Sequence, residues 1–499
     1  MNRTGYEKYY LFGLFILLCS AATCPGVTAA GSLLQPSDLE YRGAFLLPHD
    51  SDGWNFGATG LAYYPEGDSG GPADGYPGSL FGTGNDQRCE VSEISIPAPV
   101  ISAGRATSDL NTASTIQPFK GIITGVFTPA DDGLPQRVDI EYLPAQAGQS
   151  SGKLYIAWGE HYQYEQVPSH AWSELTLTAP AVQGPWYLAD FENFATNDYL
   201  FGIPEAWAAT NTPGLRLATG RFRDGSLGGS GPSLFAFGPW LDGNPPARNA
   251  RLTHVTPLLL YGKGYEEDGK DRVMRGYTSA DEWSGGAWLN AGNSAAVVFA
   301  GTKGRGNFWY GFSNGVVWPD EPPFPDFPPP PHDERGWWAE SFEGVLYFYS
   351  PDDLARVAAG TMAPHEPQPY AEMSLDPYLW HIQETWQKMH IGAVAFDRER
   401  GILYIAEPFA DGDQPIIHVF ALREPAPGRD APPAIVSRPE PVQITPSSAS
   451  GASGGGEDMP DDGATPAART PGFAGAWALA GVLCGYALQK HYRQSRIHR

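Results

Sequence analysis

The chain has 499 residues, enough for two or three average domains or for one long all-β repeat domain. Its 56 acidic residues outnumber 32 basic ones, which gives a net charge of −24. A surface this acidic repels the phosphates of nucleic acids and anionic lipid head groups. We therefore expect no nucleic-acid partner, and we interpret the acidity as a solvated exterior.

The first 30 residues have the three-part pattern of a secretory signal peptide. Arg3 and Lys8 precede an apolar run at residues 11–18, and small residues follow up to Ala29 and Ala30. The apolar run is too short to span a membrane comfortably. The pattern predicts export, with cleavage next to Ala29 or Ala30.

Residues 31–424 form a body that is poor in helical periodicity. The 60 Gly and 47 Pro residues of the chain punctuate short runs rich in Tyr, Phe, Val, Ile and Trp. A pair of runs recurs, in which the second ends at a charged or amide residue, as at 80–86 and 403–407. Repetition at this scale predicts a repeat fold built from short strands, and we favour a β-propeller.

The repeats can be laid out as five blades, whose last unit has only three strands. A spare strand at residues 39–47 precedes the first unit, so we expect it to complete the last blade and close the ring. Six or seven blades follow if residues 117–127, 183–188 and 261–277 hide further strands. Short helices are expected near 352–359 and 382–388. The expected strands, blade by blade, are 60–64, 80–84 and 90–96; 137–143, 154–158 and 171–177; 200–207, 215–219, 234–237 and 254–261; 283–289, 295–300, 308–312 and 345–349; and 391–396, 402–406 and 416–422.

After the body, the composition changes in three steps. Residues 425–470 are rich in Pro, Ser, Gly and Asp, with almost no large apolar side chains, which predicts a disordered stalk. Residues 471–489 carry an apolar run, and residues 490–499 are basic. A short apolar span before a basic end predicts a transmembrane or sorting segment with a cytoplasmic tail. We therefore expect an exported protein anchored at its C-terminus on the extracellular face of the cell membrane.

Pro471, Gly472 and Phe473 stand between the predicted stalk and the apolar run. This tail resembles the PGF-CTERM signal of archaeal cell-surface proteins, and the resemblance covers roughly the last 30 residues. It implies a sorting enzyme, an archaeosortase, that removes the apolar segment and leaves the protein on a lipid anchor. Here Ala474 follows the Phe, where Gly is common, and the basic end is longer than usual. An ordinary single-pass anchor is the alternative.

In a propeller, the connections from the second to the third strand of each blade gather on one face around the central channel. Mixed charges brought together there from distant parts of the chain suit an oriented polar ligand. The alternatives are plain solvated turns and, for the histidine before the last inner strand, a hydrogen-bonded structural role. The candidate ligand-face residues are Asn85, Asp86, Glu160, His161, Arg221, Arg223, Lys303, Arg305, His390 and Glu407.

Two acidic loops that contain glycine suit a hard cation such as calcium. They contain Asp68 and Asp74 in one loop and Asp411 and Asp413 in the other. Neither loop has the ligand spacing of a known calcium loop, so calcium at one of them is a hypothesis. The chain has no HExxH sequence and no paired Cys in its body, so zinc is not expected.

Two functions fit these patterns. We favour a binding or interaction module of the cell envelope, without catalysis, whose partner is an unidentified envelope protein or glycan. The alternative is an extracellular hydrolase or lyase that acts on a polysaccharide or another polar polymer through Asp86 or Glu160 together with Glu407. A mainly structural role in an acidic envelope layer is a third hypothesis. Convergence of two carboxylates around a concave pocket would favour the enzyme.

Overall fold

A computed structural model describes residues 32–68, 71, 75–85, 88–128, 136–146, 148–160, 166–222, 225–423 and 441–446. Among these residues, β-strands dominate and the few helices are short. No helix in these ranges is long and apolar enough to cross a membrane. The predicted signal peptide, the Pro-Gly-Phe motif, the sorting segment and the basic tail lie outside the described residues.

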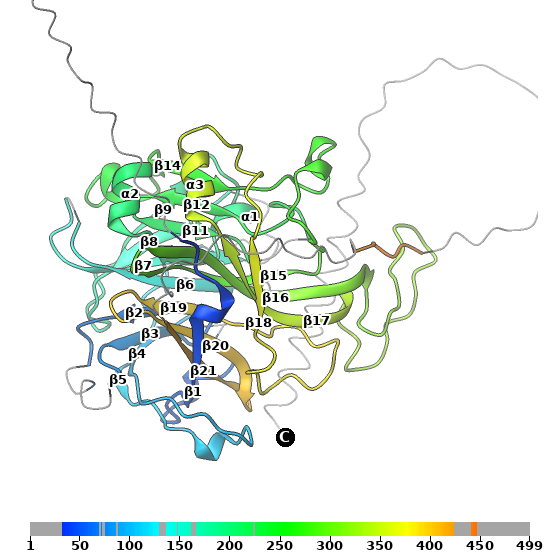
Figure 1. The fold of residues 1–499 in the computed structure, drawn as a ribbon, viewed down its shortest axis with the longest axis horizontal. Coiled ribbons are helices and arrows are strands. Elements are labelled where there is room, and N and C mark those ends of the chain that lie inside the picture. Colours follow the sequence, from blue (N-terminus) through cyan, green and yellow to red (C-terminus); the bar gives the residue numbers. More distant parts are fainter. Residues whose placement is uncertain are drawn as a thin grey trace, which may run out of the picture. The chain divides into compact units, whose positions relative to one another are not determined.

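Five antiparallel sheets form the five blades of a β-propeller (Figure 1). Their innermost strands, β2, β6, β10, β15 and β19, contact one another in a closed ring. The predicted five-bladed propeller is therefore confirmed. Blade by blade, the strands are β2 (Leu61–Tyr64), β3 (Ser79–Thr83), β4 (Val91–Ser95) and β5 (Thr115–Lys120); β6 (Gln136–Leu143), β7 (Lys153–Glu160), β8 (His170–Ser173) and β9 (Gln183–Leu188), extended by β13 (Arg251–Leu252); β10 (Tyr199–Gly202), β11 (Leu217–Gly220), β12 (Leu234–Phe237) and β14 (Val255–Leu259); β15 (Glu282–Ala291), β16 (Ser294–Gly311), β17 (Gly336–Tyr349) and β18 (Ala371–Ser374); and β19 (Val394–Asp397), β20 (Ile402–Asp411) and β21 (Gln414–Leu422) with β1 (Leu39–Leu46).

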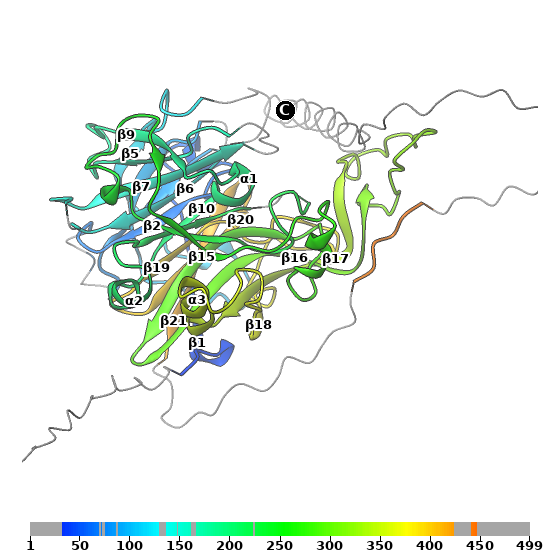
Figure 2. The same ribbon diagram turned by 90° about the horizontal axis from the view of Figure 1, so that it is seen from above.

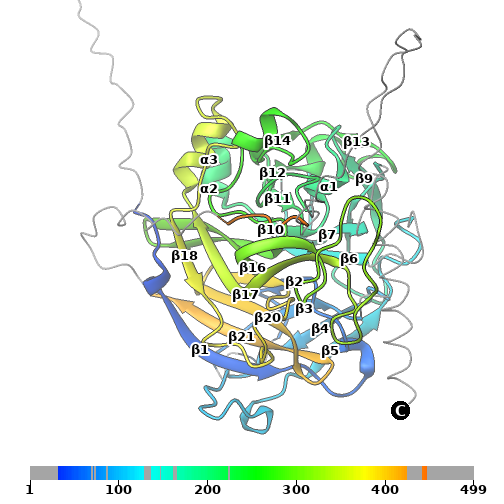
Figure 3. The same ribbon diagram turned by 90° about the vertical axis from the view of Figure 1, so that its right-hand side faces the viewer.

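The N-terminal strand closes the ring, as the sequence predicts. β1 pairs antiparallel with β21, with Leu39 opposite Leu422, so the two ends of the body lie side by side (Figure 3). The pairing has a bulge next to Gly43, whose φ is +116°. A Cβ at this position would lie 2.4 Å from the carbonyl carbon of Val100, so only glycine fits there.

Several element boundaries differ from the sequence prediction. Residues 308–311 are not a separate strand, because they are the end of the long strand β16. The outer strand of the fourth blade is instead β18. Residues 203–207 do not extend the inner strand of the third blade, because α2 (Glu205–Asn211) begins directly after Pro204. Helix α3 (Pro351–Ala358) is confirmed, whereas residues 382–388 form turns.

Two of the three segments that could have added blades, 117–127 and 183–188, overlap with β5 and β9. Both are outer strands of the five blades. The third such segment, residues 261–277, contains only a short 3-10 turn, Asp268–Asp271. The blade number therefore stays at five. One further helix, α1 (Asn193–Thr196), forms a single turn before the inner strand of the third blade.

The fourth blade carries an extension that we call the arm, residues 303–342. Here β16 continues beyond Thr302, where its pairing with β15 ends, and pairs only with β17 among the blade strands. Residues 441–446 lie along the open edge of β16 (Figure 2). The amide of Phe308 donates to the carbonyl of Val442 at 3.0 Å, and the amide of Ile444 donates to the carbonyl of Phe308 at 2.7 Å. This part of the predicted stalk is thus held against the body.

A buried carboxylate joins three of the inner strands. Oδ1 of Asp139, on β6, accepts hydrogen bonds from the amides of Leu61 (3.1 Å) and Ile140 (2.8 Å). Its Oδ2 accepts one from the amide of Leu200 at 2.8 Å. Burial raises the pKa of Asp139, although the three amides oppose this shift. The side chain therefore connects β2, β6 and β10 at the centre of the propeller.

Glu141 lies two residues further along β6, and its surroundings lead us to expect that stability depends on pH. Its Oε1 accepts from the amide of Gly202 at 2.8 Å and lies 4.0 Å from Nη2 of Arg398. Burial raises the pKa of Glu141 from 4.5 to about 7, against the effect of Arg398. Between pH 4.5 and 7 the folded protein keeps a proton that the unfolded chain releases, so its free energy of unfolding falls as pH rises.

We expect this loss to be about 2 to 3 kcal/mol, because 15% of the Glu141 side chain remains exposed. Urea unfolding at pH 4.5, 6 and 7.5 measures it, and the difference between the wild type and Glu141→Gln isolates this group from other titrations. The variant should gain stability relative to the wild type as pH rises through this window. A constant difference between the two proteins would contradict the prediction.

Candidate functional site

The second strand of each blade ends on the side where the inner strand begins, and we call this side the channel face. Among the candidate ligand-face residues, Asp86, His161 and Arg223 lie outside the described residues. Of the others, only one lines the pocket described below. The described candidates are Asn85, Glu160, Arg221, Lys303, Arg305, His390 and Glu407.

Arg221 directly follows β11 in the third blade. Its Nε lies 3.2 Å from Oδ2 of Asp198, and its Nη1 donates to Oδ1 of Asn197 at 3.1 Å. The guanidinium also lies over the ring of Phe194, 4.9 Å from its centre. Asp198 further accepts the amide of Phe222 at 2.7 Å. The charge of Arg221 is therefore balanced, and its position fixed, by buried neighbours of the same blade.

Lys303 continues β16 in the fourth blade and binds Asp281. Its Nζ lies 2.8 and 3.0 Å from the two carboxylate oxygens. Asp281 also accepts from Oγ1 of Thr278 at 2.6 Å and from the amide of Gly304 at 3.1 Å. Burial lowers the pKa of Lys303, although Asp281 opposes the shift. This second pair is also buried and balanced within one blade.

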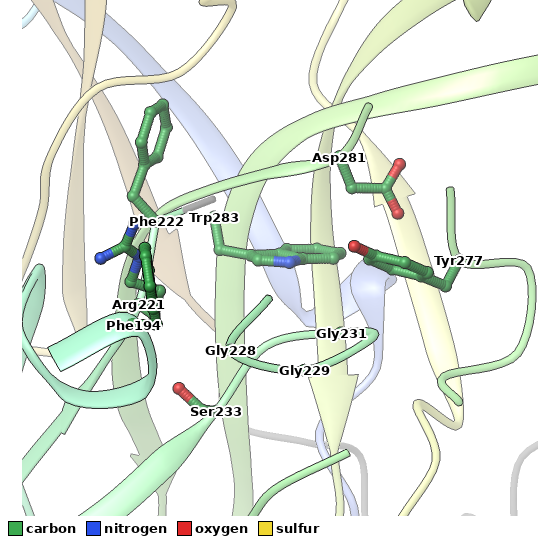
Figure 4. Close-up of a pocket in the computed structure, with 10 residues that line it drawn as sticks. All are labelled: Phe194, Arg221, Phe222, Gly228, Gly229, Gly231, Ser233, Tyr277, Asp281 and Trp283. Atoms are coloured by element: carbon green, nitrogen blue, oxygen red, sulfur yellow. The ribbon is translucent and has the colours of Figure 1, made fainter. Parts of the chain in front are cut away.

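A pocket lies between these two pairs, where the third and fourth blades meet. The amide of Trp283 donates to the carbonyl of Phe222 at 2.8 Å, which joins the blades beside it. Figure 4 shows the indole of Trp283 lying between Arg221 and the hydroxyl of Tyr277. The space inside is about 10 Å³, room for about one water molecule, and the wider empty volume of about 270 Å³ includes open solvent, so a larger group enters only if the walls move. The lining residues are Phe194, Arg221, Phe222, Gly228, Gly229, Gly231, Ser233, Tyr277, Asp281 and Trp283.

A glycine-rich loop, residues 225–231, forms one wall of the pocket. Gly229 and Gly231 have φ angles of +140° and +153°. A Cβ at Gly231 would lie 2.5 Å from the ring of Tyr261, so the loop depends on glycine at this point. The amide of Ser230 between them donates to the carbonyl of Gly262 at 2.9 Å. The glycines of this run are the sequence signal of this close approach.

Glu407 and His390 contribute to the packing of the fifth blade and its neighbouring segment. Oε1 of Glu407 accepts from the amides of Trp380 and His381, both at 2.6 Å, and Oε2 lies 2.8 Å from Nε2 of His418. Nδ1 of His390 lies 3.1 Å from a carboxylate oxygen of Asp376. Both side chains are fully buried, and neither lines the pocket.

The three other described candidates, Arg305, Asn85 and Glu160, lie elsewhere in the body. Nε of Arg305 lies 2.7 Å from a carboxylate oxygen of Glu343 on the neighbouring strand. Nδ2 of Asn85 donates to the carbonyl of Asn55 at 3.1 Å. Glu160 is buried at the end of β7. A ligand role for these residues stays a prediction.

No protein-family model matches this chain, and no curated protein matches it. A function must therefore be argued from the residues and their geometry. The five-bladed fold does not assign an activity, because fold alone does not determine function.

The calcium hypothesis concerns two separate loops. Oδ2 of Asp411 lies 3.1 Å from Nε2 of His49, and the main-chain carbonyl of Asp413 accepts the amide of Phe56 at 2.8 Å. Asp68 follows β2, and Asp74 lies outside the described residues. Within the described ranges, no three His, Cys, Asp or Glu side chains are grouped to hold a metal ion. Calcium at either loop stays a prediction.

Proposed function

We propose that this protein is a binding module of the cell envelope and that the pocket between the third and fourth blades receives its ligand. The observation that carries the proposal is the charge balance of the pocket wall. Arg221 is balanced by Asp198, and Asp281 is balanced by Lys303, so the wall presents fixed polar groups without a net charge. Such a wall suits an uncharged polar group.

The aromatic residues narrow the ligand class further. Phe222 and Trp283 stand beside the two charge pairs, and the hydroxyls of Ser233 and Tyr277 also line the space. Apolar ring faces beside oriented hydrogen-bonding groups are suited to a sugar, which has C–H faces and hydroxyl groups. We infer that the walls of this pocket open to receive a single neutral sugar unit, as the end of an envelope glycan. The predicted export signal and C-terminal anchor support this location.

Hydrolysis is the alternative, and it needs two carboxylates about 5 to 9 Å apart that face the bound group. Both oxygens of Asp281 already bind Lys303, and Glu407 is engaged by His418 and two amides. A carboxylate held in this way is poorly placed to attack a substrate or activate water. The geometry therefore favours binding over hydrolysis.

We expect Trp283→Phe to lower affinity for a neutral oligosaccharide about tenfold, which corresponds to about 1.4 kcal/mol. A glycan array selects the oligosaccharide, and titration calorimetry measures its affinity. Trp172→Phe is the matched control, because Trp172 is a buried residue of the second blade that does not line the pocket. Absence of glycan binding by the wild type, or equal losses in both variants, would refute the proposal. Release of shortened products during the titration would support the hydrolase.

A further inference from the structure

Arg335, at the end of the loop between β16 and β17, is a buried cation. Only 6% of the residue is exposed. Its Nε and Nη2 are closed off from solvent, and neither has a hydrogen-bond partner among the residues that the structure describes. Removing a charge from water without a counter-charge costs several kcal/mol. A buried arginine in this state indicates that a partner is missing from the protein alone.

Aromatic rings surround the guanidinium. Its central carbon lies 4.2 Å from the ring centre of Trp318 and 5.9 Å from that of Phe327. Trp318 in turn stacks on Phe324, with ring centres 5.0 Å apart. Cation–π contacts reduce the cost of burying the charge and fix the plane of the guanidinium. They do not supply acceptors for its N–H groups.

The two unpartnered nitrogens lie on the same edge of the guanidinium. Nε–H and one Nη2–H point in parallel, and this pair of donors matches the two oxygens of a carboxylate or sulfate group. A second cation is close, because Nζ of Lys388 lies 3.8 Å from the Cβ position of Gly336, the next residue along the chain.

We propose that Arg335 anchors an oxyanion-binding site on the arm, separate from the pocket of the channel face. The occupant is a carboxylate or sulfate group that accepts two parallel hydrogen bonds from Nε and Nη2. Residues 319–331 approach the site through two half-exposed rings, that of Phe327, 5.9 Å from the guanidinium carbon, and that of Phe324, which stacks on Trp318. They must lift for the anion to enter, and the two phenyl rings then contact the group that carries it.

Thermal unfolding of the full chain tests the proposal, with sodium acetate and sodium sulfate as probes and sodium chloride at equal ionic strength as reference. We expect acetate or sulfate to raise Tm by about 1 to 2 °C at concentrations well above Kd and to change the Trp emission. The anion that raises Tm identifies the group that the site binds. Acetate indicates a carboxylate, and sulfate indicates a sulfate ester.

Arg335→Met should abolish this response and should not lower Tm in chloride, because it removes a buried charge and keeps the packing. Arg335→Lys should weaken the response at least tenfold, since a lysine cannot donate two parallel hydrogen bonds. Arg251→Met is the control: Arg251 also lies over a ring, that of Tyr187, but it is paired with Asp190. Equal Tm in all three salts, or a full response in Arg335→Met, would overturn the proposal.

Discussion

Removal of residues 32–47 is expected to open the propeller and leave the protein largely insoluble. These residues include β1, with the buried side chains Leu39, Phe45 and Leu46. Leu34 before the strand and Leu47 after it are buried as well. Losing five large apolar side chains costs about 8 to 15 kcal/mol, which is comparable to the whole stability of a typical domain. The deletion also exposes β21 as an unpaired edge, which favours aggregation.

A permuted chain provides the control for this deletion. Leu39 lies opposite Leu422, and the amide of Arg423 donates to the carbonyl of Asp38 at 2.8 Å. A short glycine linker after Arg423, followed by residues 38–47, should therefore restore the strand as a hairpin. Soluble yield and circular dichroism compare the three chains. A shortened chain with unchanged yield and Tm would contradict the closing role of β1.

The blade architecture could be predicted because its signals are local. Short apolar runs between Gly and Pro mark most strands, and the missing fourth strand of the last unit had one spare candidate at the N-terminus. The length of β16 could not be predicted, because Gly301 and Gly304 resembled a break. In the structure a Cβ at Gly301 would lie 1.9 Å from the carbonyl oxygen of Glu282. These glycines thus permit close packing within a continuous strand, and this reason is visible only in three dimensions.

The pocket could be predicted only in part, because its residues meet through the packing of two blades. Arg221 follows a strand of the repeat, so its place on the channel face could be inferred. Trp283 and Asp281 stand at the start of the next inner strand, and their meeting with Arg221 depends on how two blades pack. Glu407 had the right residue type, but its partner His418 comes from the neighbouring strand and engages it within the blade core.

Asp139→Ala is expected to lower the free energy of unfolding by about 3 to 5 kcal/mol. The change leaves the amides of Leu61, Ile140 and Leu200 buried without their acceptor, and each such loss costs about 1 to 3 kcal/mol. Asp139→Asn should cost only about 1 to 2 kcal/mol, because its remaining oxygen keeps part of the bonding. Urea unfolding followed by circular dichroism measures both values.

Asp242→Ala is the matched control, because Asp242 also accepts three hydrogen bonds, from the amide and hydroxyl of Thr253 and from the amide of His254. Those donors belong to exposed residues, which water can reach when the carboxylate is removed. The control should therefore lose about 1 kcal/mol or less. If both alanine variants lost the same free energy of unfolding, the number of hydrogen bonds would determine the loss, and the burial of their donors would have no effect. A much larger loss at Asp139 would instead mean that one buried carboxylate holds three inner strands of the ring together.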